Sequence, residues 1–122
     1  LGPSGAGKSD LALRLHAVGA DLIVDDLLTL SAHNGVIHAH APARQPALLH
    51  VRGIGMLALP AHGPIAARTP VALALHLCAA PGDGSVAQIS WPGHGALPLV
   101  LLNPFEISAC IKVRLALARW GL

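Results

Sequence analysis

The chain of 122 residues has almost no aromatic side chains and little charge, and each shortage excludes a class of protein. Its aromatic residues are two Trp and one Phe, so the core must be aliphatic and a base-stacking surface for single-stranded nucleic acid is not expected. The eight Lys and Arg residues are scattered without a basic tract, so no nucleic-acid partner is expected. Because 53% of the residues are hydrophobic and 11% are charged, a disordered chain is excluded.

Cysteines and long apolar runs are also scarce. Cys78 and Cys110 lie far apart inside apolar segments, which is typical of two thiols in a cytosolic protein and not of a disulfide framework. No apolar run reaches the roughly 18–20 residues that a membrane-spanning helix needs, and no signal peptide is visible. We therefore expect a cytoplasmic protein without a membrane partner.

The most informative segment lies at the start of the chain. Residues 2–9, Gly-Pro-Ser-Gly-Ala-Gly-Lys-Ser, match the Walker A pattern G-x-x-x-x-G-K-[ST] at every fixed position. Glycines let backbone N–H groups turn toward phosphate oxygens, and the helix that follows presents its positive end to the same anion. A Gly-rich turn that caps a helix and binds nothing is the alternative. The pattern predicts an ATP site with Mg²⁺ built from Gly2, Pro3, Ser4, Gly5, Ala6, Gly7, Lys8 and Ser9.

Two side chains of this segment have distinct expected roles. Lys8 should reach the β- and γ-phosphates, and the Ser9 hydroxyl should ligate magnesium. A phosphate-binding loop normally follows a buried strand, and no such strand precedes Leu1. We therefore expect residues 1–122 to form a single P-loop kinase domain that is a fragment lacking its upstream strand.

A pair of acids forms the second candidate site. The apolar run 22–24 predicts a buried strand, and Asp25 and Asp26 stand at its exit. Beside bound phosphates, one carboxylate would hold the metal and the other would accept a proton from an attacking hydroxyl. The alternative to a catalytic role is that both residues cap a helix or lie in a solvated turn.

The third candidate is Arg52-Gly53-Ile54-Gly55, in which a guanidinium beside flexible glycines suits a mobile phosphate contact. A bend in a strand would have the same composition. The histidines show no spacing that resembles a zinc site, so we expect them to be structural or on the surface.

The remaining pattern predicts a helix, then strands with hairpins, and then a second helix. Residues 8–18 are strong helix formers that end at Gly19, and Asn103, Pro104 and Glu106 have the capping pattern of a C-terminal helix. That helix should bury an apolar stripe formed by Phe105, Ala109, Val113 and Leu117. Between the two helices we expect a hairpin around 33–35, a helix or turn at 46–51, a buried strand at 71–78, and strands at 88–91 and 97–102. This order predicts the α/β class, a P-loop-containing mixed sheet with a helix after the phosphate loop and a C-terminal helix.

Taken together, these segments resemble the catalytic domain of HPr kinase/phosphorylase, in its short proteobacterial form. Residues 2–15 are similar to the family's phosphate loop and helix, and 22–26 to its Asp-Asp strand. Residues 49–55, Leu-His-Val-Arg-Gly-Ile-Gly, are similar to its signature Glu-[Ile/Val]-Arg-Gly-Leu-Gly. Residues 103–106 and 112–115 resemble the family's C-terminal segment.

The resemblance implies an ATP-dependent protein-serine kinase that phosphorylates an HPr-like phosphocarrier protein and so regulates carbohydrate metabolism through the phosphotransferase system. It implies that Asp26 accepts the proton in kinase mode, with Asp25, Lys8 and Arg52 as its catalytic neighbours. It also implies that Ser9, Asp25 and the position of His50 hold the metal, and that the protein is a homohexamer.

Three departures from the family pattern affect these expectations. The family's catalytic histidine precedes the phosphate loop and is not in this chain, and the signature glutamate is replaced by His50. The segment that the long forms use for phosphorolysis has no clear counterpart, so kinase chemistry is expected and phosphorylase chemistry is not. Two other functions stay open: a catalytically weakened nucleotide-sensing module, and a small-molecule kinase of the phosphate-loop type, although no Arg-rich lid is visible.

Overall fold

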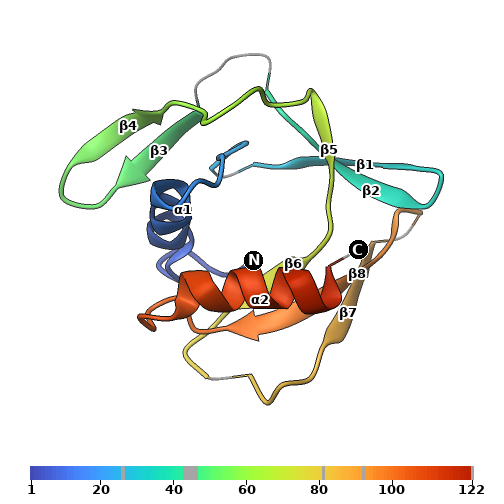
Figure 1. Cartoon of the computed structure of the whole chain (residues 1–122). Coiled ribbons are helices and arrows are strands. Elements are labelled where there is room, and N and C mark those ends of the chain that lie inside the picture. The colour runs from blue at the N-terminus through green and yellow to red at the C-terminus, as the bar shows by residue number, and fades with distance from the viewer. Residues whose placement is uncertain (26, 43–46, 81, 92, 122) are drawn as a thin grey trace.

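The computed structural model describes the chain except for residues 26, 43–46, 81, 92 and 122, and it has an α/β architecture (Figure 1). Along the described residues one helix is followed by eight strands and then by a second helix, which confirms the predicted fold class with a helix after the glycine-rich segment and a helix near the C-terminus. Neither helix of the described part is long and apolar enough to cross a membrane. The elements are α1 (Lys8–Ala17), β1 (Thr29–His33), β2 (Val36–His40), β3 (Ala47–Val51), β4 (Gly55–Leu59), β5 (Arg68–Pro70), β6 (Ala74–Leu77), β7 (Ala87–Trp91), β8 (Gly95–Leu102) and α2 (Ala109–Trp120).

The sheet that carries both helices is mixed. Strand β8 lies between β6 and β7 and pairs parallel with β6 and antiparallel with β7. The backbone of Leu1 bonds to the free side of β6, because its N–H₃⁺ donates to the Leu75 carbonyl and its carbonyl accepts from the Leu77 N–H. The chain therefore leaves this sheet edge directly into the glycine-rich segment. Helix α2 lies across the front of β8 (Figure 1).

Two further groups of strands lie beyond this sheet. The β1–β2 hairpin turns at Asn34 and Gly35, which both have positive φ, as a two-residue type I′ turn requires. Strand β5 extends that pair to three strands. The β3–β4 hairpin stands apart from both sheets and lies against α1 (Figure 1). The predicted hairpin around 33–35 is confirmed.

The core joins α1 to the mixed sheet and to the first turn of α2. Leu11 of α1, Leu77 of β6, Leu102 of β8 and Ala109 of α2 are all buried and pack together. Leu15, Cys110 and other half-buried side chains surround this cluster, and Cys78 and Cys110 are both free thiols. The helix that follows the glycine-rich segment is thus fixed by burial at its middle, in a core without aromatic side chains.

Two expected elements between the helices are wrong. Residues 22–24 are half-buried and lie outside the strands, because their backbone makes no ladder with another described segment. Residues 47–51 form strand β3 instead of a helix or turn, because alternate side chains are buried and the chain returns as β4. The burial of every second side chain identifies this segment as a strand. A five-residue apolar run alone does not distinguish a strand from a helix.

The expected start of the C-terminal helix is also wrong. Helix α2 begins at Ala109, after an N-terminal residue Ser108 whose side chain makes no cap. The Asn103 side chain accepts a hydrogen bond from the Phe105 N–H (3.0 Å) and so forms a local turn, and Glu106 pairs with Lys112. Asn followed by Pro is equally typical of a turn.

The apolar stripe of α2 is shifted as well. Phe105 and Leu117 are exposed, whereas Ala109 and Ala116 are buried and Val113 is half-buried. The helix buries the face with the smaller side chains because it lies close to α1 and β8. Predicted spacing was right for the middle of the stripe and wrong at both ends.

Adjacent leucines on β3 provide a test of this packing. Leu49 is fully buried at 0% exposure and Leu48 is 54% exposed. A buried Leu→Ala change costs about 2–5 kcal/mol, because it removes contacts and leaves a cavity. We predict that Leu49→Ala lowers the free energy of unfolding by about 2 kcal/mol or more, whereas Leu48→Ala changes it by less than about 0.5 kcal/mol. Urea denaturation measures both variants, and equal losses would contradict the assigned face of β3.

Candidate functional site

The glycine-rich loop, residues 2–9, has the backbone that an anion cradle requires. Gly5 has φ +81° and Gly7 has φ +95°, a left-handed conformation that favours glycine. A Cβ added at Gly5 would meet no atom within 4 Å, so the loop is open at this point. Helix α1 starts directly after Gly7, and none of the described side chains caps it. Its first N–H groups therefore remain available to an anion in front of the helix.

Gly7 has a second role, in packing. A Cβ at this position would lie 2.9 Å from the Pro104 side chain and 3.1 Å from the Phe105 ring. Pro104 is fully buried. The turn between β8 and α2 therefore packs directly against the glycine-rich loop at Gly7. This contact leaves room only for glycine at that position.

Arg14 connects the same two parts, a role that no pattern in the sequence predicts. From the middle of α1 its guanidinium donates to the carbonyls of Pro104 and Glu106, and its Nε pairs with Asp10 (2.9 Å). The bonds to Pro104 and Glu106 span about three quarters of the chain, so only the tertiary structure could reveal them. Arg14 positions the loop, and it is not aimed at the open side of Gly5.

The structure brings together three of the predicted site residues. The Ser9 hydroxyl donates a hydrogen bond to Oδ1 of Asp25 (3.1 Å), across 16 residues of sequence. Lys8 folds over the loop, and its Nζ donates to the carbonyls of Gly2 and Pro3 (3.2 Å to Pro3). The hydroxyl and the carboxylate oxygen thus lie next to each other at the start of α1, beside the lysine.

The electrostatics of this region are simple. The pKa of the Leu1 amino group is lowered, first by partial burial and second by the positive charge of Lys8. Lys8 forms no ion pair with the described carboxylates, so its charge faces only carbonyl oxygens. An unpaired cation beside an uncapped helix start is an attractive environment for phosphate.

The remaining predicted residues lie elsewhere or cannot be placed. Asp26 lies outside the described residues. Arg52 is exposed in the turn of the β3–β4 hairpin, where its guanidinium bonds to none of the described residues. His50 is exposed on β3 opposite Met56, and it is not part of the three-residue group of potential metal ligands found among the described residues. Residues 52–54 form the turn of this hairpin, and Gly55 begins β4.

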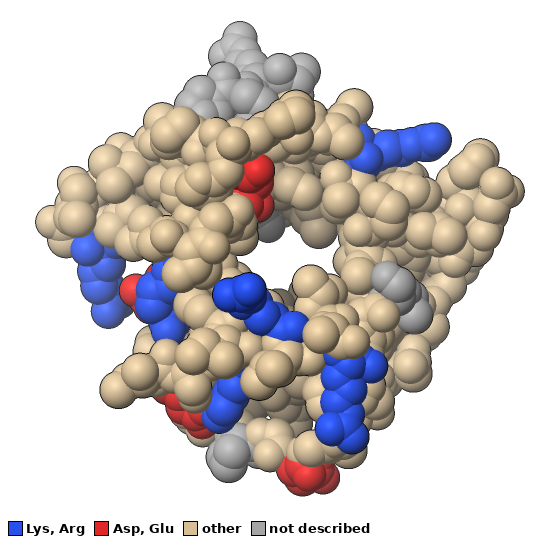
Figure 2. Space-filling view, in the orientation of Figure 1, with Lys and Arg blue, Asp and Glu red and all other residues tan. Residues whose placement is uncertain are grey.

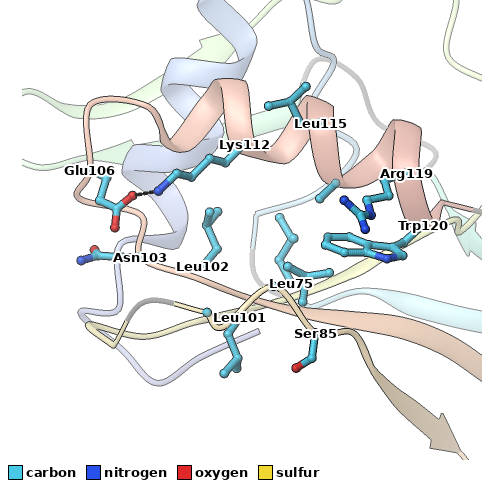
Figure 3. Close-up of a pocket in the computed structure, with 14 residues that line it drawn as sticks. Leu75, Ser85, Leu101, Leu102, Asn103, Glu106, Lys112, Leu115, Arg119 and Trp120 are labelled. Atoms are coloured by element: carbon cyan, nitrogen blue, oxygen red, sulfur yellow. Dashed lines mark hydrogen bonds and ion pairs between the residues drawn. The ribbon is translucent and has the colours of Figure 1, made fainter.

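A separate cavity of about 290 Å³ lies between α2 and the mixed sheet (Figure 3). Its floor is apolar, with Leu75, Leu101 and Leu102, and Arg119 stacks on Trp120 at 5.2 Å at one end. None of the residues of the glycine-rich loop lines it. This cavity is therefore not the predicted phosphate site.

The surface charges are unevenly distributed on one face of the molecule. Figure 2 shows an opening near its middle, with an acidic side chain at the upper margin and Lys or Arg side chains along the lower margin. The basic side chains are separated by uncharged surface, so this face offers no continuous basic stripe, in agreement with the scattered basic residues of the sequence.

Comparison with known proteins supports the resemblance seen in the sequence. No protein-family model matches the chain. Curated proteins named HPr kinase/phosphorylase match part of it: the one from Bordetella pertussis is 49% identical over 57 residues, which is 46% of this chain and 18% of that protein. The one from Clostridium novyi is 38% identical over 60 residues, 49% of this chain and 20% of that protein. The matched segment is thus about a fifth of the length of these relatives.

A solved structure matches almost the whole chain. The structure of the Hpr(Ser) kinase/phosphatase from Coxiella burnetii superposes with a TM-score of 0.74 at 23% identity, over 96% of this chain and 87% of that chain. The α/β fold is confirmed by this likeness, and the similarity to HPr kinase/phosphorylases is confirmed by the curated relatives over about half of the chain.

The lysine of the glycine-rich loop provides the first test of the site. Lys8→Ala should weaken ATP binding roughly tenfold to a hundredfold, because a charge-assisted hydrogen bond contributes about 1.5–3 kcal/mol. The control is Lys112→Ala, which removes the only other lysine of the chain, on α2 and paired with Glu106. Calorimetric titration with ATP measures both variants, and an unchanged affinity in Lys8→Ala would count decisively against the loop as a nucleotide site.

Proposed function

We propose that this chain is the nucleotide-binding part of an ATP-dependent protein-serine kinase that phosphorylates an HPr-like phosphocarrier protein. The observation that carries the proposal is the hydrogen bond between Ser9 and Asp25. It joins the glycine-rich loop to the first acid of the pair, and so connects two of the three motifs whose combination resembles HPr kinase/phosphorylase. The similarity to proteins of that name in sequence and to an Hpr(Ser) kinase/phosphatase in fold supports it further.

The residues present fit ATP and magnesium. The open side of Gly5, the uncapped start of α1 and the Lys8 ammonium together offer donors and positive charge to a triphosphate. Ser9 and Asp25 offer two adjacent oxygen ligands, which is what Mg²⁺ prefers. When bound, the ion would neutralise charge that develops on the phosphates during transfer.

The contact between Ser9 and Asp25 supports separate roles for the two acids. In the proposal, Asp25, which accepts the hydrogen bond of Ser9, is the metal-side carboxylate, and Asp26, as the resemblance implies, accepts the proton of the attacking serine hydroxyl. The guanidinium of Arg52, which bonds to none of the described residues and lies on a hairpin turn just before Gly53, would contact phosphate after the hairpin moves. Phosphorolysis is not part of the proposal, since the departures found in the sequence argue against it.

Further parts of the proposal rest on the resemblance. They are a cytoplasmic location, a role in regulating carbohydrate metabolism through the phosphotransferase system, and assembly into a homohexamer. A small-molecule kinase and a weakened nucleotide sensor are the competing functions, and the replacement of the signature glutamate by His50 favours the sensor.

One assay separates the three functions. ATP consumption is measured with the protein alone, with an HPr-like phosphocarrier protein, and with small-molecule acceptors. The proposal predicts consumption that depends on the phosphocarrier, together with phosphoserine on it. Consumption that requires only a small molecule would favour the second function, and ATP binding without consumption would favour the third.

The acid pair provides the next prediction. Asp26→Asn keeps the size of the side chain but removes the proton acceptor, so phosphate transfer to serine should fall by about 10²–10⁴ while ATP still binds. Asp83→Asn, in an exposed loop, is the control and should keep full activity. Steady-state kinetics and ATP titration measure both. If Asp25→Asn lowers transfer more than Asp26→Asn, the two roles are reversed, and if neither lowers it, the kinase proposal fails.

His50 provides a prediction about the metal. An imidazole is a poorer ligand for Mg²⁺ than a carboxylate, and it lacks the negative charge that helps to hold a divalent ion. We predict that His50→Glu lowers the magnesium concentration at half-maximal activity, and that Mn²⁺ supports the wild-type protein better than Mg²⁺. The matched control is His33→Glu on the β1–β2 hairpin, which should leave the midpoint unchanged. If wild type and His50→Glu need the same magnesium concentration for half-maximal activity, His50 is not a metal ligand.

A further inference from the structure

A group of potential metal ligands lies at the far end of α1 from the glycine-rich loop. His16 is in the last turn of the helix, Asp21 follows it, and His62 is in the segment between β4 and β5. One ligand atom from each residue lies within 4.8 Å of the others. His62 is 46 residues away from His16, so the tertiary structure alone brings these side chains together.

The hydrogen bonds within this group leave each residue with a free ligand atom. His16 Nε2 lies 2.9 Å from the Pro60 carbonyl oxygen, and His62 Nε2 lies 2.8 Å from the His16 carbonyl oxygen. A carbonyl only accepts, so both Nε2 atoms carry the proton and both Nδ1 atoms keep a lone pair. Asp21 accepts the His62 N–H through Oδ1 at 2.7 Å and keeps Oδ2.

This is the arrangement that surrounds many bound metals. A histidine ligand usually donates its other ring N–H to a carbonyl or carboxylate, which fixes the tautomer and the orientation of the ring. The two rings lie with their centroids 4.5 Å apart and their planes tilted by 33°. The Asp21 bond to the His62 backbone holds the third ligand beside them. The hydrogen bonds thus hold the two rings and the carboxylate in place before any ion arrives.

We propose that His16, Asp21 and His62 form a site for a divalent transition metal ion of the zinc class. Two imidazole nitrogens and one carboxylate oxygen suit zinc, which takes three such ligands and leaves its fourth tetrahedral position to water. Asp21 and His62 are exposed and His16 is half-buried, so solvent reaches the site. Magnesium prefers oxygen ligands in an octahedral arrangement and is not expected here.

The site is independent of the proposed nucleotide chemistry, although α1 connects the two. Its ligands tie the end of α1 to the segment that leads to Asp25 and to the chain that leaves β4. An ion that binds the folded chain and not the unfolded chain stabilises the folded chain by mass action. We therefore expect zinc to raise the unfolding temperature, and it should do so in the absence of ATP.

The sequence did not predict this site. We expected the histidines to be structural or on the surface, since no pair has a zinc-site spacing. His16 and Asp21 are separated by a helix end and a turn at Gly19, which no spacing rule describes.

Metal binding by the full chain tests the proposal. Zn²⁺ is titrated by calorimetry without nucleotide, and Co²⁺ is added as a spectroscopic probe whose visible absorption reports ligand geometry. We expect one site at neutral pH and a Co²⁺ spectrum of low coordination number. Mg²⁺ at the same concentrations should not compete.

Conservative variants connect the binding to these residues. His62→Gln keeps a donor for the His16 carbonyl, and Asp21→Asn keeps an acceptor for the His62 N–H, so the fold should survive, and circular dichroism checks this. Each variant should weaken Zn²⁺ binding by roughly tenfold or more and remove the zinc-dependent rise in unfolding temperature. His33→Gln, a histidine on the β1–β2 hairpin, is the control and should bind as wild type does.

The outcomes are decisive in both directions. Unchanged Zn²⁺ affinity in His62→Gln and Asp21→Asn, or an equal loss in His33→Gln, would overturn the proposal, as would the absence of wild-type binding. Lys8→Ala should still bind Zn²⁺ normally. The zinc site and the proposed ATP site can therefore fail independently of each other.

Discussion

The packing of α1 against the turn that follows β8 is the constraint on which the rest of the structure depends. Gly7 lies against Pro104 and Phe105 with no room for a side chain, and Leu11 is buried one turn further along the helix. Arg14 then binds the carbonyls of that same turn. These contacts at Gly7, Leu11 and Arg14 hold α1 along most of its length. The orientation of the glycine-rich loop is therefore set by the packing of α1 and not by the loop itself.

This fixed helix determines where chemistry can occur at each of its ends. At its start, Lys8 and Ser9 stand beside Asp25, a set of oxygen ligands and one cation that suits a phosphate with a hard metal ion. At its other end, His16 meets Asp21 and His62, a nitrogen-rich set that suits a softer ion. The chain from α1 to β1 passes both ends, because Asp21 and Asp25 are only four residues apart.

The hairpins outside the mixed sheet differ from this core in their exposure. In the β3–β4 hairpin, Leu49 is buried against the helix side, whereas Ile54 and Met56 are exposed near Arg52. The turn of this hairpin has few buried side chains. Segments with little buried surface open more easily than the core does. The proposed phosphate contact by Arg52 depends on such movement, while the glycine-rich loop has no comparable freedom.

Local chemistry allowed the sequence by itself to determine the α/β class, the glycine-rich loop, the helix behind it and the 33–35 hairpin. The left-handed conformation that these turns require is found at Gly5, Gly7, Asn34 and Gly35. Glycine and asparagine favour this conformation, so the residue type alone predicts it. Only the tertiary structure decided the rest. A strand at 47–51, the late start of α2 at Ala109 and the absence of a strand at 22–24 depend on whether a partner segment is present to pair or pack. Arg14 binds the Pro104 carbonyl, and His62 binds the His16 carbonyl, across long stretches of sequence. No local sequence pattern predicts such contacts, because they form only when the whole chain has folded.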